Sequence, residues 1–529
     1  MYSTYKGNQN KDKIENLVGN YAKIITYAFL LLIIIVFPFY APHGYEGIGT
    51  SKFYFFRAAG LVCFGLLAPA AVFLIFRQVK KGDSVRLSIT DKALLLYGGA
   101  VLLSFLCSDW KKNALWGIDG WYMGALTQLM FIAIYFAVSR FIQRSEVWYV
   151  LFMVVSSGVF LHGLLNRFSF YPVQMKGANP GFISSLGNIN WFCGYWMLVF
   201  PIGLVFYWSG LGNTILKKTG LILYTILGFM IGIVQGSNSG FLALGTVFFV
   251  LFLLSFEKED KILKWLELVV LFAVSILLIS ILKGWFPGRL NYQNTIEEIL
   301  TKYTVGFGIF VIAVISYSIL HYLLRKKNLE VKKLLPVRNG VAVFAVLVII
   351  IMFLLVLYYN VRQETAGTSK LAQVFLIDAD WGNGRGTTWK AGVQAFVSMP
   401  FMKKIIGVGP DCFYEYAYSN WDIAVMLYNV FGDARLTNTH NEWLTLLVNV
   451  GVCGLLFYVT AFMSSVFRQL KAGKKQELLL VSAVCILTYV VHNMVSFQQV
   501  ISTPIAFILL GMGENLIRNI SIEKEKCLT

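Results

Sequence analysis

The sequence predicts an all-α integral membrane protein with about 14 transmembrane helices and a large outward-facing loop that contains short amphipathic helices. Two observations support this fold class. Of the 529 residues, 57% are hydrophobic and only 14% are charged, whereas about a quarter of the residues of a soluble protein are charged. In addition, long apolar runs recur along the whole chain, and in lipid only helices and closed barrels satisfy every backbone polar group.

The apolar runs define the predicted helices in order along the chain. A spanning helix needs about 20 mostly apolar residues. Runs of about this length cover residues 22–40, 57–76, 93–109, 122–141, 147–165, 191–209, 219–235, 240–256, 265–283, 304–324, 339–359, 443–467, 478–495 and 503–519. They predict transmembrane helices 1–11 in residues 1–359, a large extracytoplasmic loop subdomain in residues 360–442, and helices 12–14 with a cytoplasmic tail in residues 443–529.

The basic residues predict the orientation of these helices. The formal net charge is +18, and such a surplus in a soluble chain would suggest nucleic-acid binding. In membrane proteins, however, Lys and Arg collect in cytoplasmic loops, and here they gather in alternate loops, for example in residues 77–86, 325–338 and 468–475. We therefore expect a multi-pass protein of the cytoplasmic (plasma) membrane with both termini cytoplasmic, the long loop extracytoplasmic, and no nucleic-acid partner.

The large loop contains three notable segments. The segment GRGTTWKAGVQAFVSM (residues 384–399) has apolar residues at helical spacing, which predicts a short amphipathic helix at the membrane surface or over a cavity. A threonine near its start is a candidate cap. Gly407 and Gly409 then predict a tight turn, and a polar segment (residues 438–442) precedes the twelfth predicted helix.

Two side chains of this loop have both a functional and a structural interpretation. His440 is one of five histidines, and imidazole is the side chain whose ordinary pKa suits proton transfer near neutral pH. The alternative is a solvent-exposed interfacial histidine. Arg385 has the guanidinium fork that binds phosphate oxygens in pairs. The alternative is a loop arginine in a surface contact.

Several motifs together resemble those of the O-antigen ligase and polymerase family, bacterial membrane enzymes that act on undecaprenyl-diphosphate-linked glycans. The resemblance extends over several predicted helices, and the motifs follow one another in the family's order. The residues that carry it are the turn WGIDGWYMGALTQL from Trp116, the helix entry at Gly187, Asn188 and Asn190, the pair Arg385 and Trp389, the turn Gly407 to Pro410, and the helix entry with His440, Asn441, Leu444, Gly451 and Gly454.

The resemblance implies a metal-independent glycosyltransferase without a cofactor, acting at the outer face of the cytoplasmic membrane in cell-envelope polysaccharide biosynthesis. Its partners would be an undecaprenyl-diphosphate-linked glycan donor, a glycan, lipid or wall-polymer acceptor, and the bilayer itself. By the same resemblance, Arg385 holds the donor diphosphate and His440 assists deprotonation of an acceptor hydroxyl. Asn441, Trp389, Gly407 and Gly409 would support them.

One position departs from the family pattern. Where relatives often carry a Ser-Arg-x-Gly element, this chain has GSNSGFLAL, so that Asn238 stands in place of the arginine. An asparagine can hydrogen-bond an oxyanion but cannot neutralise it. Arg289, Lys176 and Arg167 are the candidate replacement cations, and backbone amides of this turn are a further anion-binding possibility. The donor-binding candidates are therefore Arg385, Asn238, Arg289, Lys176 and Asn190.

Other readings of the sequence stay open. A lipid-linked oligosaccharide flippase or other multi-span transporter could also have about 14 spans. A peptidoglycan-type polymerase of the shape, elongation, division and sporulation class would use an outward aspartate, for which Asp378, Asp380 and Asp411 are candidates. Ligation and polymerisation are not distinguished, and neither the sugars nor the acceptor is identified.

Two further groups of residues carry structural interpretations. His162 and His492 lie towards the ends of predicted helices, and we interpret them as interfacial or helix-pairing residues. Seven cysteines show no CxxC or Cys/His spacing, so we expect no metal site.

Overall fold

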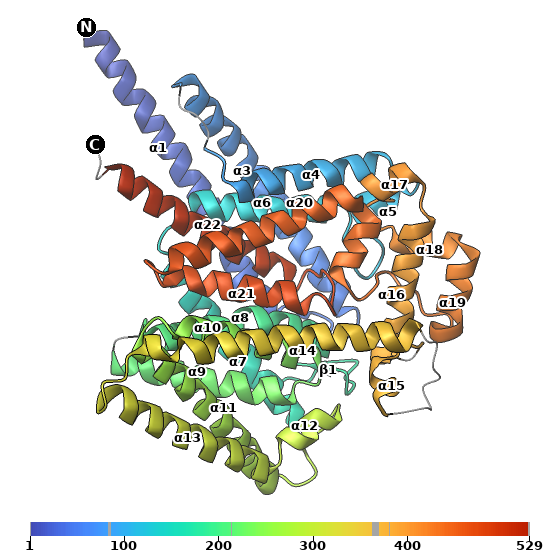
Figure 1. Ribbon diagram of the computed structural model, residues 1–529. Helices are drawn as coiled ribbons and strands as arrows, with labels where there is room; N and C mark the ends of the chain where they lie inside the picture. The colour runs from blue at the N-terminus through green and yellow to red at the C-terminus, as the bar shows by residue number, and fades with distance from the viewer. Residues whose placement is uncertain (1, 83–85, 213, 362–369, 380, 527–529) are drawn as a thin grey trace.

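The computed structural model describes residues 2–82, 86–212, 214–361, 370–379 and 381–526 (Figure 1). Within these residues the regular secondary structure is helical apart from one short antiparallel pair of strands, β1 (Phe182–Ile183) and β2 (Gly187–Asn188). The prediction of an all-α fold is therefore confirmed.

The helices follow the apolar runs of the sequence. Those before the strand pair are α1 (Tyr2–Leu31), the π-helical turn η1 (Leu32–Val36), α2 (Phe37–Phe39), α3 (Ile48–Lys80), α4 (Ile89–Leu106), α5 (Lys111–Trp116), α6 (Ala125–Phe141) and α7 (Ser145–Arg167). Next come α8 (Ile189–Ser209), α9 (Ile215–Val234), α10 (Ser239–Ser255), α11 (Glu259–Trp285), α12 (Thr295–Leu300), α13 (Tyr303–Arg325), the 3-10 turn η2 (Val331–Leu334) and α14 (Leu335–Val361). The last are α15 (Lys370–Phe375), α16 (Trp381–Ser398), α17 (Phe401–Ile406), α18 (Phe413–Ser419), α19 (Trp421–Phe431), α20 (Glu442–Gly473), α21 (Leu478–His492) and α22 (Thr503–Lys526).

Length and composition make the chain a multi-pass membrane protein. Among the described residues, 10 helices are long and apolar enough to cross a bilayer. The helices α6, α10, α19 and α21 are apolar but shorter, and α22 covers the last predicted run. The figure of about 14 spans thus stays a prediction, as does the topology of the large loop.

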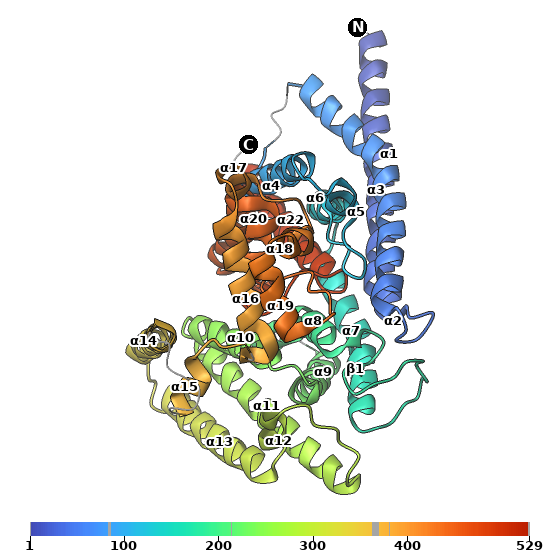
Figure 2. The same cartoon turned by 90° about the vertical axis from the view of Figure 1, so that its right-hand side faces the viewer.

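Different segments of the chain lie at the two ends of the helical array. Figure 1 shows both chain termini at one end and the short helices α16–α19 at the opposite end, which we call the loop end. Figure 2 looks onto the loop end, with α16, α18 and α19 towards the viewer. If the basic loops are cytoplasmic, as the sequence predicts, the loop end faces outward.

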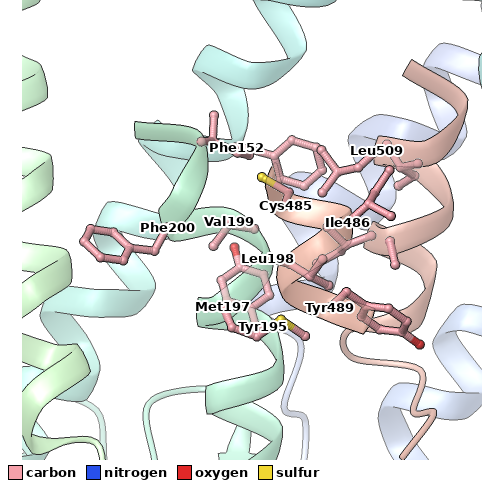
Figure 3. Close-up of a cluster of buried hydrophobic side chains, with 14 of the residues drawn as sticks. Phe152, Tyr195, Met197, Leu198, Val199, Phe200, Cys485, Ile486, Tyr489 and Leu509 are labelled. Carbon is pink, nitrogen blue, oxygen red and sulfur yellow. The ribbon is translucent and has the colours of Figure 1, made fainter. Parts of the chain in front are cut away.

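The centre of the core is α8. Every side chain from Phe192 to Trp208 is buried, which explains why this helix is apolar on all its faces. Figure 3 shows Met197 and Leu198 of α8 in one cluster with Cys485 and Ile486 of α21. Further along the same two helices, Sγ of Cys193 near the start of α8 lies 3.6 Å from Nε2 of His492 at the end of α21, where the polar groups described next are gathered.

Candidate active site

The helix α16 lies against the segment that leads into α20. The hydroxyl of Thr388 donates to the carbonyl oxygen of Thr439 at 2.8 Å. Arg385 is one turn before Thr388, and His440 directly follows Thr439, so this bond brings the two sequence-predicted residues to one place. The helix begins at Trp381, earlier than the predicted threonine cap, and Thr388 joins two segments instead of capping one.

Arg385, Trp389 and His440 lie close together and share one property. On each of them one buried polar atom has no hydrogen-bond partner among the described residues, namely Nε of Arg385, Nε1 of Trp389 and Nδ1 of His440. The guanidinium of Arg385 makes one weak bond, from Nη1 to the carbonyl of Gly382 at 3.3 Å. Because buried polar groups are nearly always paired in native proteins, three such atoms on neighbouring residues indicate a site that binds a polar ligand.

The backbone and the ring of His440 are each held by one neighbour. Its backbone is left-handed, with φ 53°, a conformation that costs free energy in a residue with a side chain and is often found at functional sites. Asn438 Oδ1 accepts the His440 backbone N–H at 3.0 Å, and the ring of Phe497 packs edge-on at 5.1 Å. Asn441 caps α20 by accepting the N–H of Leu444 at 3.0 Å.

Burial and charge set the protonation of this pair. Burial, and then the positive charge of Arg385, lower the pKa of His440 to about 4. Burial also lowers the pKa of Arg385 from its ordinary value. At neutral pH the imidazole is therefore neutral and can accept a proton.

The predicted tight turn after α17 is present and packs into a break in α20. Gly407 and Gly409 have φ of 81° and 130°, and Gly451 inside α20 has φ 69°. The N–H of Gly409 donates to the carbonyl oxygen of Asn449 at 3.0 Å. A Cβ at Gly451 would collide with the carbonyl of Ile405. The single helix expected over 443–467 is therefore interrupted at Gly451. At this break the carbonyl oxygens of Val448 and Asn449 accept hydrogen bonds from the turn.

Asp411, the next residue after this turn, has a structural partner far away in the sequence. Its Oδ2 accepts the backbone N–H groups of Ile118 and Met123, both at 2.8 Å. The carboxyl is buried, and burial raises its pKa to about 7. Of the other aspartates considered for a peptidoglycan-type polymerase, Asp378 is half-buried and Asp380 lies outside the described residues.

A buried hydrogen-bond network begins at the first residue of α20. Glu442 accepts hydrogen bonds from the hydroxyls of Tyr458 at 2.6 Å and Tyr489 at 2.9 Å and from the side-chain amide of Asn493. Asn493 Oδ1 in turn lies 2.9 Å from Nδ1 of His492. The sequence analysis did not single out Glu442. Its position beside His440 at a helix entry was a usable signal, because ionisable residues in membrane helices rarely lack a role.

The network continues from His492 to the entry of α8. Nε2 of His492 lies 3.1 Å from the hydroxyl of Ser239, which lies 2.7 Å from that of Ser237. Ser237 donates to Asn190 Oδ1 at 2.8 Å. The helix-pairing role predicted for His492 is thus observed, and the chain of bonds joins Asn190, a donor-binding candidate, to α21.

Three of the donor-binding candidates are not brought to the Arg385–His440 pair by any contact among the described residues. Asn238 precedes α10 with an exposed side chain that caps nothing. Arg289 is exposed and lies over the ring of Phe170 at 4.8 Å. Lys176 is exposed, and its carbonyl accepts the N–H of Tyr45 at 2.8 Å.

Arg167 differs from these cations. It is buried and donates to the carbonyl of Gln235 and to that of Pro180 at 3.3 Å. A Cβ at Gly236 would collide with its guanidinium. Arg167 therefore packs on the turn in which Asn238 replaces the expected arginine, while its Nε has no partner among the described residues.

The comparisons with known proteins agree with the motifs. Residues 299–459 match the family model described as O-antigen ligase. The matched range contains Arg385, the turn from Gly407 and His440. No curated protein matches the chain.

Proposed function

Because residues 299–459 carry the O-antigen ligase domain, we propose that this multi-pass membrane protein is a metal-independent glycosyltransferase working at the outer face of the cytoplasmic membrane. It transfers or polymerises a glycan from an undecaprenyl-diphosphate-linked donor onto an acceptor hydroxyl. The acceptor belongs to a glycan, a lipid or a wall polymer, and the product is a cell-surface polysaccharide. The family match and the apolar helices indicate a membrane glycan ligase or polymerase, and the donor, the acceptor and the side of the membrane are our proposal.

The observation that carries the proposal is the group of three unpartnered buried atoms on Arg385, Trp389 and His440. A guanidinium and an indole N–H are donors, and a diphosphate offers several acceptor oxygens. The neutral imidazole is a base, and its Nδ1 has no hydrogen-bond partner in the part of the chain that the structure describes. The donors for an anion thus lie on α16, and the base for a hydroxyl lies on the neighbouring segment before α20. Glycosyl transfer from a diphosphate requires both kinds of group.

The reaction that fits these groups is a direct displacement. The acceptor oxygen attacks the anomeric carbon of the donor sugar while His440 takes the hydroxyl proton. The bond between that carbon and the diphosphate oxygen breaks, and undecaprenyl diphosphate leaves with the bonding electrons. Arg385 stabilises the charge that develops on the leaving group, and the proton on His440 is then released to solvent or to the diphosphate.

Arg167 is the second cation of this proposal. It packs against the turn at Gln235 and Gly236, which neighbours the Ser237–Ser239 segment bonded to His492. We therefore assign to Arg167 the electrostatic role that the family arginine would have at Asn238. Asn190 then acts through this network, whereas Arg289 and Lys176 stay outside it.

The proposal is tested by comparing lipid-linked glycans in four strains: normal, deleted, His440→Ala and His43→Ala. His43 is exposed and serves as the matched control. We expect undecaprenyl-diphosphate-linked glycan to accumulate, and the mature polymer or conjugate to disappear, in the deletion and His440→Ala strains alike. His43→Ala should behave as the normal protein.

The same comparison separates the alternatives. Loss of long chains with retention of single-unit conjugates identifies a polymerase, and loss of all conjugates identifies a ligase. A normal His440→Ala strain, together with donor trapped on the cytoplasmic face in the deletion strain, would instead identify a flippase and remove His440 from its assigned role.

A further inference from the structure

A cavity lies at the loop end, apart from the Arg385–His440 pair. Its volume is about 350 Å³, within the range of small-ligand pockets. Three separate parts of the chain form its wall, namely the outer part of α3, the segment 112–122 around α5, and residues between 414 and 437. Neither Arg385 nor His440 lines it. The early turn that the sequence analysis noted at Trp116 thus has a place in the structure that the proposed reaction does not use.

The wall of this cavity has an excess of positive charge. Arg57, Lys112 and Arg435 line it, and among the described residues none of the three forms an ion pair. Two carboxyl groups, Asp119 and Glu415, also line it. Asn113, however, donates to Glu415, and burial raises the pKa of Glu415 above its ordinary value, so that its negative charge is weakened. The remaining cations favour an anionic ligand.

Aromatic rings lie beside these cations. The guanidinium of Arg57 lies 4.8 Å from the ring of Tyr54 and 5.5 Å from that of Trp116, and both rings are exposed. Tyr414 also lines the cavity. A flat ring packs well against the apolar C–H face of a sugar. An aromatic belt at the membrane interface would account for the rings alone, but not for their position in a cavity with three unpaired cations.

The cavity lies close to the imidazole of the proposed base. Thr437 lines it, and the next residue, Asn438, accepts the backbone N–H of His440. Trp121 also lines it and packs on Phe497 at 4.6 Å. The ring of Phe497 also packs on the His440 ring at 5.1 Å. A ligand in the cavity is thus one layer of side chains away from His440.

We infer that this cavity binds the acceptor, and that the acceptor is a glycan bearing carboxylate or phosphate groups. The inference rests on the proposed function, because it assigns the second substrate of that reaction. Its physical basis is the combination of unpaired cations for the anionic groups, exposed rings for the sugar faces, and the short path to His440. The Arg385 side of the site then serves the donor, and this cavity serves the acceptor.

Binding of defined probes tests the inference without requiring turnover. The full chain in nanodiscs is titrated with hexagalacturonate, which carries a carboxylate on every sugar, and with the neutral maltohexaose. We expect hexagalacturonate to bind at least about tenfold more tightly than maltohexaose. Lys112→Gln and Arg435→Gln should each weaken hexagalacturonate binding about tenfold, and both positions are exposed, so folding is not at risk.

Two control variants complete the experiment. Lys283 also lies over a tyrosine ring, at 5.1 Å, but outside the cavity, so Lys283→Gln should leave hexagalacturonate binding unchanged. Arg385→Gln should also leave it unchanged, because Arg385 belongs to the donor side. Binding that is retained in Arg385→Gln and lost in Lys112→Gln supports the acceptor assignment.

Three results would overturn it. The first is equal affinity for charged and neutral probes, or unchanged affinity in both Lys112→Gln and Arg435→Gln. The second is displacement of hexagalacturonate by undecaprenyl diphosphate, which would assign the cavity to the donor. The third is displacement by phosphatidylglycerol at equal potency, which would assign it to a lipid headgroup. Since none of these readouts measures transfer, they are independent of the His440→Ala strain comparison.

Discussion

The low pKa of His440 gives the sharpest prediction about catalysis. A base in glycosyl transfer must be neutral, and the pH profile of kcat/KM reports the pKa of such a group in the free enzyme. Lowering an imidazole pKa from 6.5 to about 4 corresponds to roughly 3 kcal/mol of preference for the neutral form. We therefore expect kcat/KM to stay constant as the pH falls through about 6.5 and to decline only near pH 4.

The charge of Arg385 is the second cause of this low pKa, after burial. Removing that charge in Arg385→Gln makes protonation of His440 easier and so raises its pKa. The acidic limb of the profile should accordingly move to higher pH. The shift should be less than half of the difference between 4 and 6.5, because burial, the larger cause of the low pKa, is unchanged in the variant. The low rate of this variant does not affect the position of the limb.

The assay uses the purified protein in nanodiscs with a labelled lipid-linked donor, and each sample is returned to neutral pH after acid exposure to check that activity recovers. A wild-type limb near pH 6.5 would show that the imidazole is not buried beside Arg385 in the working enzyme. An identical limb in wild type and Arg385→Gln would show that the two side chains do not interact.

Four further outcomes are expected. Arg385→Lys keeps the charge but loses the fork, so kcat/KM should fall roughly 100-fold; near-normal activity would exclude paired recognition of the diphosphate. Asp411→Asn retains an oxygen that accepts both backbone N–H groups, so near-normal activity is expected, whereas a catalytic aspartate would lose its function. Gly451→Ala should destabilise the protein by more than about 2 kcal/mol in thermal unfolding, while Gly99→Ala, a helical glycine with open space around it, should be neutral or slightly stabilising. Chelators should leave the initial rate unchanged, and a loss of activity restored by a divalent ion would contradict metal independence.

Much of the fold follows from local properties of the sequence. Each apolar run forms a helix because lipid and buried core both require internal backbone hydrogen bonds, and such runs are visible without knowledge of any contact. The residues Arg385 and His440 were proposed as site residues because their types and their neighbours resemble a known pattern, and their roles stay a prediction. Their proximity, through Thr388 and Thr439, then fits the prediction.

What the sequence did not predict depends on contacts between distant residues. Asp411 was considered as a catalytic candidate, yet its partners are backbone amides almost three hundred residues earlier. Periodicity and spacing describe one segment at a time, so they contain no information on such pairs. The same limitation explains why the hydrogen-bond partners of Glu442 were not predicted and why Arg167 could not be preferred over Arg289 and Lys176 before its contact with the Gly236 turn was seen.

The long-range hydrogen bonds of Asp411 and His492 also form late during synthesis of the chain, because their partners are made early. A ribosome completes the turn that contains Ile118 long before it makes Asp411, and Ser239 long before His492. Until the later residues are inserted, the early turn has no carboxylate to fasten it and the Ser239 hydroxyl has no imidazole beside it. A partly made chain is consequently a set of helices in which neither of these long-range hydrogen bonds has formed, and if the proposed function is right, transfer begins only after the last helices are made.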